Sequence, residues 1–205
     1  MRILVVRAHP LDATISRSMQ LADAFLDAFT DSHPDADIQD LRLYDVAVPE
    51  IDVDLLTGWR ALRGGTAFSQ LSESQQNKIT LFNTHTQNFL DADVVVIANP
   101  LWNLSIPTRL KAWIDTVVVA GKTFRYSKTG QPEGLAHGKR VVHLQSSGGH
   151  FNAQDPASQY IDTILGFLGC KVTTLTAEGM DHEPDRAEEI MADAVERARQ
   201  LAASL

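Results

Sequence analysis

The sequence predicts an α/β protein built on one doubly wound, five-stranded parallel sheet with helices on both faces. Two observations carry this prediction. Strand-like and helical segments alternate along the chain, and several strand-like segments are short apolar runs of the kind that a parallel sheet buries on both faces. Right-handed crossovers between such segments most often give the strand order 2-1-3-4-5, which places a binding crevice between strands 1 and 3.

The five strand-like segments share a run of apolar and β-branched residues between turn signals. In chain order they are residues 3–6, 38–43, 94–98, 140–145 and 171–177.

Helical patterns fall between these strands. Residues 18–29 carry apolar side chains on a 3.6-residue period, and residues 72–90 begin with a capping box of Ser72 and Gln75. The remaining helices are expected at residues 108–118, at residues 158–168, and after Pro184.

Two connections are longer than a minimal alternation needs, at residues 44–70 and 120–137. Loops of this length inside a compact domain are usually functional. Their aromatic residues indicate ordered contact with a ligand or a partner chain. These residues are Trp59, Phe68, Phe124 and Tyr126.

Composition limits the possible classes of protein. A chain of 205 residues that is 44% hydrophobic is expected to form one domain over residues 1–205. The net charge of −8, without a basic cluster, argues against a nucleic-acid partner.

The single cysteine, Cys170, is expected as a packed core thiol. No apolar run approaches the roughly 20 residues of a spanning helix, and residues 3–6 are too short for a signal-peptide core, so we expect a cytoplasmic protein without a membrane partner.

The third strand leads directly into a ligand-suited loop, because Trp102, Asn103 and two leucines follow it before Pro107 opens the next helix. This composition offers a flat apolar wall interrupted by one amide, which suits a planar heteroaromatic ligand with a polar rim. An ordinary βα loop whose tryptophan covers the core is the alternative.

Two further loops reach the same predicted edge of the sheet. Ser16 and Ser18 open the first helix, where hydroxyls and unpaired N–H groups suit a phosphate, although either serine alone would serve as an N-cap. After the fourth strand, Gly148 and Gly149 permit close backbone approach to a ligand edge, or form a tight turn without one.

Taken together, these loops resemble those of the FMN-dependent NADH:quinone oxidoreductases, also called azoreductases, in order and spacing over nearly the whole chain. The segments that carry the resemblance are residues 16–18, 100–104, 121–126, 133–135 and 146–149. The resemblance implies a flavodoxin-like fold, one FMN per chain, and a homodimer with both sites at its interface. It also implies two-electron reduction of quinones and azo compounds by NADH, with NADPH left open as reductant.

The resemblance also assigns site residues. The phosphate site falls on His9, Ser16, Arg17 and Ser18, the flavin-ring loop on Pro100, Leu101, Trp102, Asn103 and Leu104, and the pyrimidine edge on Ser146, Ser147, Gly148 and Gly149. The sequence departs from the family pattern at several of these positions. His9 stands where many relatives have a hydroxyl, Trp102 and Leu104 replace a more usual Tyr and Phe, and Ser147 stands where relatives often have Arg.

Asn103 and His150 are the candidates for catalytic roles, with His150 expected over the flavin. No protein nucleophile is needed, because the flavin carries the redox chemistry and the protein supplies position and electrostatics. N–H donors of Gly148 and Gly149 would stabilise negative charge on the reduced ring.

Other site classes lack their motifs. Residues 145–148 lack the first glycine of a nucleophile elbow, residues 134–139 lack the spacing and the final hydroxyl of a P-loop, and no Gly-x-Gly-x-x-Gly follows the first strand. The seven histidines show no metal-ligand spacing, and His33, His137 and His182 are interpreted as solvated. The open alternative is a flavodoxin-like electron carrier or a flavin-bearing regulatory subunit of a membrane transporter. Long aromatic loops argue against the carrier, which would expose its flavin edge.

Overall fold

The computed structural model describes residues 1–205 and contains the predicted parallel sheet, with its strands in the order β2-β1-β3-β6-β7. The strands are β1 (Arg2–Arg7), β2 (Asp37–Arg42), β3 (Val94–Pro100), β6 (Arg140–Ser147) and β7 (Lys171–Glu178). This is the order 2-1-3-4-5 once the strands of the main sheet are counted alone, so the predicted topology is confirmed. Four of the predicted strands are one or two residues shorter than the observed ones, and the prediction for β2 is shifted by one residue.

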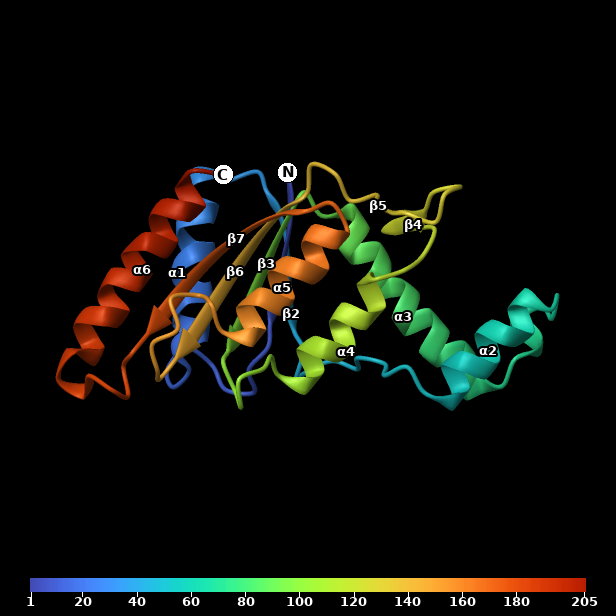
Figure 1. Cartoon of the computed structure of the whole chain (residues 1–205), viewed down its shortest axis with the longest axis horizontal. Coiled ribbons are helices and arrows are strands. Elements are labelled where there is room, and N and C mark those ends of the chain that lie inside the picture. The colour runs from blue at the N-terminus through green and yellow to red at the C-terminus, as the bar shows by residue number, and fades with distance from the viewer.

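Two helical layers cover the sheet (Figure 1). The helices α1 (Arg17–Ser32) and α6 (Ala187–Ala203) lie together on one face, where they bury a cluster of 18 apolar residues against the sheet. On the other face lie α3 (Glu73–Asp91), α4 (Thr108–Val117) and α5 (Pro156–Phe167), over a cluster of 21 residues centred on the fully buried Trp113. Both faces of the central strand β3 are therefore buried, as its unbroken apolar run predicts.

Side-chain caps fix where the helices begin. Ser72 Oγ accepts from the N–H of Gln75 at 3.2 Å, and Gln75 Oε1 accepts from the N–H of Ser72 at 3.0 Å, which confirms the predicted capping box. Helix α5 begins two residues earlier than predicted, because Asp155 is its N-cap and Pro156 occupies its first turn.

The two long connections are not loops throughout, and this expectation was wrong. The first contains α2 (Val53–Arg63) and the short 3-10 helix η1 (Phe68–Gln70). Helix α2 packs on α3 through a separate small apolar cluster, and Trp59 meets the ring of Phe82 edge-on at 4.9 Å. Figure 1 shows α2 at the far end of α3, away from the sheet.

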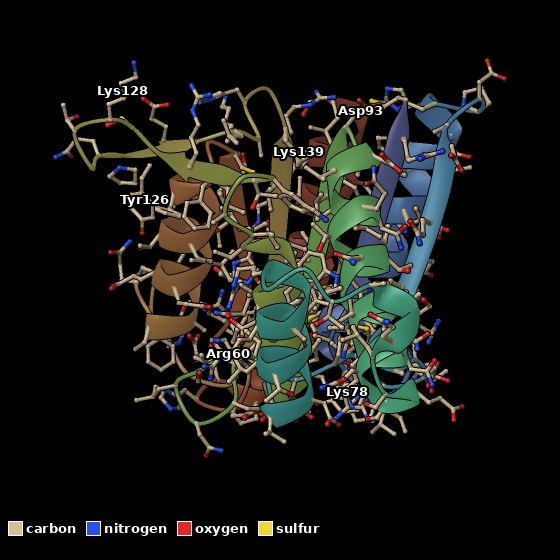
Figure 2. The ribbon with its side chains drawn as sticks, turned by 90° about the vertical axis from the view of Figure 1, so that its right-hand side faces the viewer. Arg60, Lys78, Asp93, Tyr126, Lys128 and Lys139 are labelled. Carbon is tan, nitrogen blue, oxygen red and sulfur yellow. The ribbon has the colours of Figure 1, made fainter.

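The second connection folds into an antiparallel pair, β4 (Phe124–Tyr126) and β5 (Pro132–Gly134). Figure 2 shows Tyr126 and Lys128 on this hairpin, which projects from the body of the protein. A short 3-10 helix, η2 (Pro184–Arg186), precedes α6.

Cys170 is buried as expected, and burial raises the pKa of its thiol to about 11. None of the helices combines the length and the apolar character needed to cross a bilayer. The carboxyl ends of β1, β3, β6 and β7 meet at one edge of the sheet, the lower edge in Figure 1, so their following loops form a common surface.

Candidate functional site

Two adjoining cavities lie at the carboxyl edge of the sheet, with volumes of about 360 and 340 Å³. They share Leu101, Ser147, Gly148 and Asp181. The first is otherwise lined by His9, Ile15, Ser16, Arg17, Pro100, Trp102 and Ser146, and the second by Asn103, Leu104, Gly149, Phe151 and His182. The three predicted loops thus meet at one place, and a fourth loop, after β7, joins them.

A hollow of about 390 Å³ lies at the opposite edge of the sheet, beside Asp93 and Lys139 (Figure 2). Lys139 is buried there, and its Nζ donates to the carbonyls of Leu90 and Ala92 at the end of α3. Burial holds the pKa of Lys139 below its ordinary value. This lysine closes a helix C-terminus, so its place in the fold is explained without a ligand.

The start of α1 forms a polar corner of the first cavity. Ser16 is the N-cap, with its Oγ 3.4 Å from the N–H of Met19, and the buried hydroxyls of Ser16 and Ser18 lie 3.2 Å apart. The N–H groups of Arg17 and Ser18 have no acceptor within the protein. Ser16 is therefore a cap and also lines the cavity, whereas Ser18 is fully buried and is not part of the lining. This corner offers the hydroxyl of Ser16 and free amide donors at the positive end of a helix.

His9 lies on the neighbouring wall of the same cavity, with its ring centroid 5.3 Å from that of Trp102. The N–H of Leu11 donates to His9 Nδ1 at 3.0 Å. Leu11 O also lies 3.2 Å from Nδ1, so both backbone contacts of the ring are made at Nδ1, and Nε2 makes no hydrogen bond within the protein.

The loop after β3 is a tight hairpin turn. The N–H of Trp102 donates to Ser105 O at 3.1 Å and the N–H of Ser105 donates to Trp102 O at 2.9 Å, while Asn103 and Leu104 have φ angles of 51° and 57°. Left-handed backbone is unusual for leucine and costs about 1 kcal/mol or more. The turn leaves Trp102 and Leu104 exposed by 40% and 55%, which gives the site an apolar surface facing outward.

Buried polar side chains support the strand ends beneath this loop. Asn99 Nδ2 donates to Pro100 O at 3.0 Å and to Gln145 Oε1 at 3.2 Å, and Gln145 Nε2 donates to Asp155 Oδ2 at 2.9 Å. These residues connect β3, β6 and the start of α5, so the two central ligand loops are fixed relative to each other. Sequence reasoning missed this network, although polar residues at the end of otherwise apolar strands were its signal.

The loop after β6 is held by a carboxylate from β7. Glu178 accepts from the N–H groups of Phe151, Asn152 and Ala153 at 2.6, 2.7 and 2.9 Å. Burial of Glu178 opposes its ionisation, but these hydrogen bonds prevail and hold its pKa below the ordinary value. Gly148 and Gly149 precede this anchored segment, and their N–H groups have no acceptor within the protein.

Asp181, in the loop after β7, is a cavity residue that sequence reasoning missed. Its Oδ1 lies 2.8 Å from Arg17 Nη1, and a Cβ atom at Gly148 would lie 2.0 Å from its Oδ2. A side chain at position 148 would therefore displace Asp181, which is a further reason for glycine there, and the expected approach of a ligand stays a prediction.

His150 lines neither cavity, and its place over the flavin stays a prediction. Its Nε2 lies 2.8 Å from Glu183 Oε1, and its ring packs directly against Gly179. His182, which we interpreted as a solvated loop residue, is exposed but lines the second cavity. Asn103 also lines the second cavity.

Comparison with known proteins places this site in a family. A family model described as flavodoxin-like fold matches residues 1–202. The chain is 40% identical over 207 residues to the FMN-dependent NADH:quinone oxidoreductase of Bacillus pumilus, covering 98% of this chain and 97% of that one. The chain belongs to this family of oxidoreductases. The family and the fold predicted from the sequence are therefore confirmed.

Solved structures of related oxidoreductases agree. An azoreductase from Bacillus anthracis str. Sterne superposes with a TM-score of 0.91 at 33% identity, covering 100% of this chain and 99% of that one. An FMN-dependent NADH-azoreductase from Bacillus anthracis str. Ames Ancestor, solved in complex with FMN, gives a TM-score of 0.87 at 29% identity, covering 98% of this chain and 99% of that one.

The residues at the site of this family member fit FMN chemically. The corner at α1 supplies the Ser16 hydroxyl and unpaired amides for a phosphate, and the turn after β3 supplies an apolar surface for a ring. Gly148 and Gly149 line the second cavity, and their unpaired N–H groups are able to donate to the polar edge of a ring.

Proposed function

We propose that this protein binds one FMN per chain and catalyses the two-electron reduction of quinones and azo compounds by NADH. The observation that carries the proposal is the convergence of a phosphate-suited helix start, an apolar turn and unpaired glycine amides around two adjoining cavities. Membership of the FMN-dependent NADH:quinone oxidoreductase family supports the same conclusion.

FMN, when bound, would accept two electrons from NADH and pass them to the acceptor. The residues of the chain hold and surround the flavin. Ser16 and the amides of Arg17 and Ser18 bind the phosphate, and Ser18 positions the Ser16 hydroxyl from behind at 3.2 Å, with His9 on the neighbouring wall. Trp102 and Leu104 cover one side of the ring and exclude water.

The amides of Gly148 and Gly149 stabilise negative charge at the polar edge of the ring. Preorganised amide donors are effective there, because they require no reorganisation when charge develops. The anchoring of the following segment by Glu178, and the Asn99–Gln145–Asp155 network, keep these donors in position.

Absorption and turnover test this function together. The purified protein should be yellow or become yellow with added FMN, and the flavin released by denaturation should be FMN. NADH should be consumed with 1,4-benzoquinone or an azo dye as sole acceptor, and NADPH in parallel assays determines the preferred reductant. A protein that takes up no FMN would contradict the proposal, and a yellow protein without turnover would point to an electron carrier.

The assembly that we propose is a homodimer, with each chain a single domain over residues 1–205. Exposed apolar and aromatic side chains on projecting segments support it: Leu56 of α2 is 55% exposed, Phe68 of η1 is 43% exposed and Tyr126 of the hairpin is 63% exposed. Sedimentation at micromolar concentration should give about twice the chain mass of 22.6 kDa. A strictly monomeric, fully active protein would contradict the shared site.

The cytoplasm is the compartment that we propose. It is supported by the use of NADH as reductant and by a single cysteine, buried in the core, that forms no disulfide.

A further inference from the structure

An ion pair crosses the first cavity between two segments that are far apart in the sequence. Arg17 Nη1, at the start of α1, lies 2.8 Å from Asp181 Oδ1, in the loop between β7 and α6. We propose that Asp181 sets the affinity of the site for the phosphate of its flavin, because the carboxylate and the phosphate compete for Arg17. This inference rests on the proposed function and assigns a specificity-determining role to Asp181.

Asp181 is fixed on the cavity wall by its backbone. Its N–H donates to Gly148 O at 3.1 Å, and the N–H of Gly179 donates to Gly149 O at 3.1 Å, so two pairs of residues tie the loop after β7 to the loop after β6. The turn is closed by His182, whose N–H donates to Gly179 O at 2.9 Å. The backbone of Asp181 is therefore held beside the cavity, with its carboxylate within reach of Arg17.

Arg17, in contrast, is free to change partner. It makes one hydrogen bond through its side chain, to Asp181, and its side chain is 38% exposed. An exposed pair of this kind contributes little to stability, so exchanging the carboxylate for a phosphate costs little. A phosphate that accepts from two N–H groups of a guanidinium is bound more strongly than a carboxylate that accepts from one.

The charges around this cavity make Asp181 decisive. Arg17 is the one Lys or Arg in its lining, and Asp181 is the one Asp or Glu. With the pair formed, the negative charge of Asp181 offsets the positive charge of Arg17. A phosphate at Ser16 is then attracted less by Arg17 and is also repelled by the nearby carboxylate. Removing the carboxylate leaves the positive charge of Arg17 available to the phosphate. Because Asp181 is 67% exposed, solvent screens this effect, and we expect a change of about three- to tenfold in affinity.

Titration of the flavin-free protein with FMN and with riboflavin separates the phosphate from the ring. Fluorescence quenching of each flavin gives its dissociation constant without any turnover. Asp181→Asn should bind FMN about three- to tenfold more tightly than wild type and should bind riboflavin, which has no phosphate, with unchanged affinity. Raising the salt concentration should shrink the gain for FMN, since the effect is electrostatic.

Asp193→Asn is the matched control. Asp193 is an exposed carboxylate of α6 that pairs with Arg197 at 2.8 Å, and it lines neither cavity. This variant removes the same charge from the chain and should leave both affinities unchanged. An equal gain in Asp193→Asn would show that net charge alone acts, and would overturn the role of Asp181.

A double-mutant cycle tests whether Arg17 is the shared partner. Arg17→Gln should weaken FMN binding and not riboflavin binding, and the gain from Asp181→Asn should be smaller when Arg17 is absent. Weaker binding of both flavins by Asp181→Asn would show that the carboxylate contacts the ring, and an unchanged FMN affinity would show that it does not act; either result overturns the inference. If wild type binds neither flavin, the proposed function fails instead.

Discussion

His143 Nε2 lies 2.9 Å from Asn99 Oδ1, which joins the two central strands near the ends that carry the cavity loops. The partners determine which atom holds the proton. Asn99 Nδ2 donates to the carbonyl of Pro100, so Asn99 Oδ1 faces the histidine and accepts from an N–H on Nε2. His143 Nδ1, 3.5 Å from Thr174 Oγ1, is then left as the acceptor. Burial lowers the pKa of His143 to about 4, so the ring is neutral near pH 7.

We expect the stability of the fold to fall between pH 7 and pH 5 because of His143. Burial lowers the pKa of this histidine from 6.5 to about 4. The stabilising contribution of the neutral ring is complete above the pKa of the histidine in the unfolded chain. It is lost as the pH falls towards the pKa in the folded protein, because over this range the unfolded chain binds a proton at His143 and the folded protein does not. Over this interval the loss is about 2 kcal/mol.

Urea denaturation at the two pH values measures this loss. His143→Gln keeps an N–H donor for Asn99 and does not titrate, so its free energy of unfolding should fall by about 2 kcal/mol less than that of wild type. An identical fall in both proteins would show that His143 is not the titrating group.

The main sheet could be predicted because its signals are local. The apolar run of residues 94–98 and the capping box of Ser72 and Gln75 are each formed by residues close together in the sequence. Both are present in the structure as expected. Helix α2 was missed because its apolar face is narrow and packs on α3 rather than on the sheet, although Leu55, Trp59 and Leu62 have helical spacing. Strands β4 and β5 have three residues each, too few to show an alternating pattern.

The site was predicted in outline because parallel topology brings the loops after successive strands to one edge. Its details depend on contacts between loops that no local pattern encodes. Asp181 lines the cavity because the loop after β7 pairs with the loop after β6, and His150 pairs with Glu183, which is distant in the sequence. The roles of the site residues remain proposals that the following experiments test.

The strain in the left-handed backbone of Leu104 should appear as a difference in stability between two substitutions at this position. Leu104→Gly and Leu104→Ala remove the same apolar side chain, but only glycine adopts a φ of 57° without strain. The flavin-free Leu104→Gly protein should be about 1 kcal/mol more stable than Leu104→Ala. Urea denaturation measures the difference, and titration with FMN should show the two variants equally weakened. Equal stabilities would mean that the turn relaxes around alanine.

The two histidines near the glycine loop should differ in their effect on turnover. His182 lines the second cavity, so His182→Gln should lower the rate of NADH-dependent quinone reduction by up to about 10²-fold, the lower end of the range for a positioned donor. His150 faces Glu183 outside both cavities, so His150→Gln should remain within about twofold of wild type. Steady-state rates of both yellow variants decide this assignment. A large loss confined to His150→Gln would return the catalytic role to His150.

NADH and the acceptor should use one pocket in turn, which predicts ping-pong kinetics. If FMN fills the two adjoining cavities, nicotinamide and quinone must each reach the same uncovered face of its ring, so they cannot bind there together. Electrons stored between the half-reactions make a complex of both substrates unnecessary. Double-reciprocal plots against NADH should give parallel lines as the quinone concentration is varied, and quinone in excess should inhibit competitively with NADH. Intersecting lines would mean that both substrates are held at once, at separate sites beside the flavin.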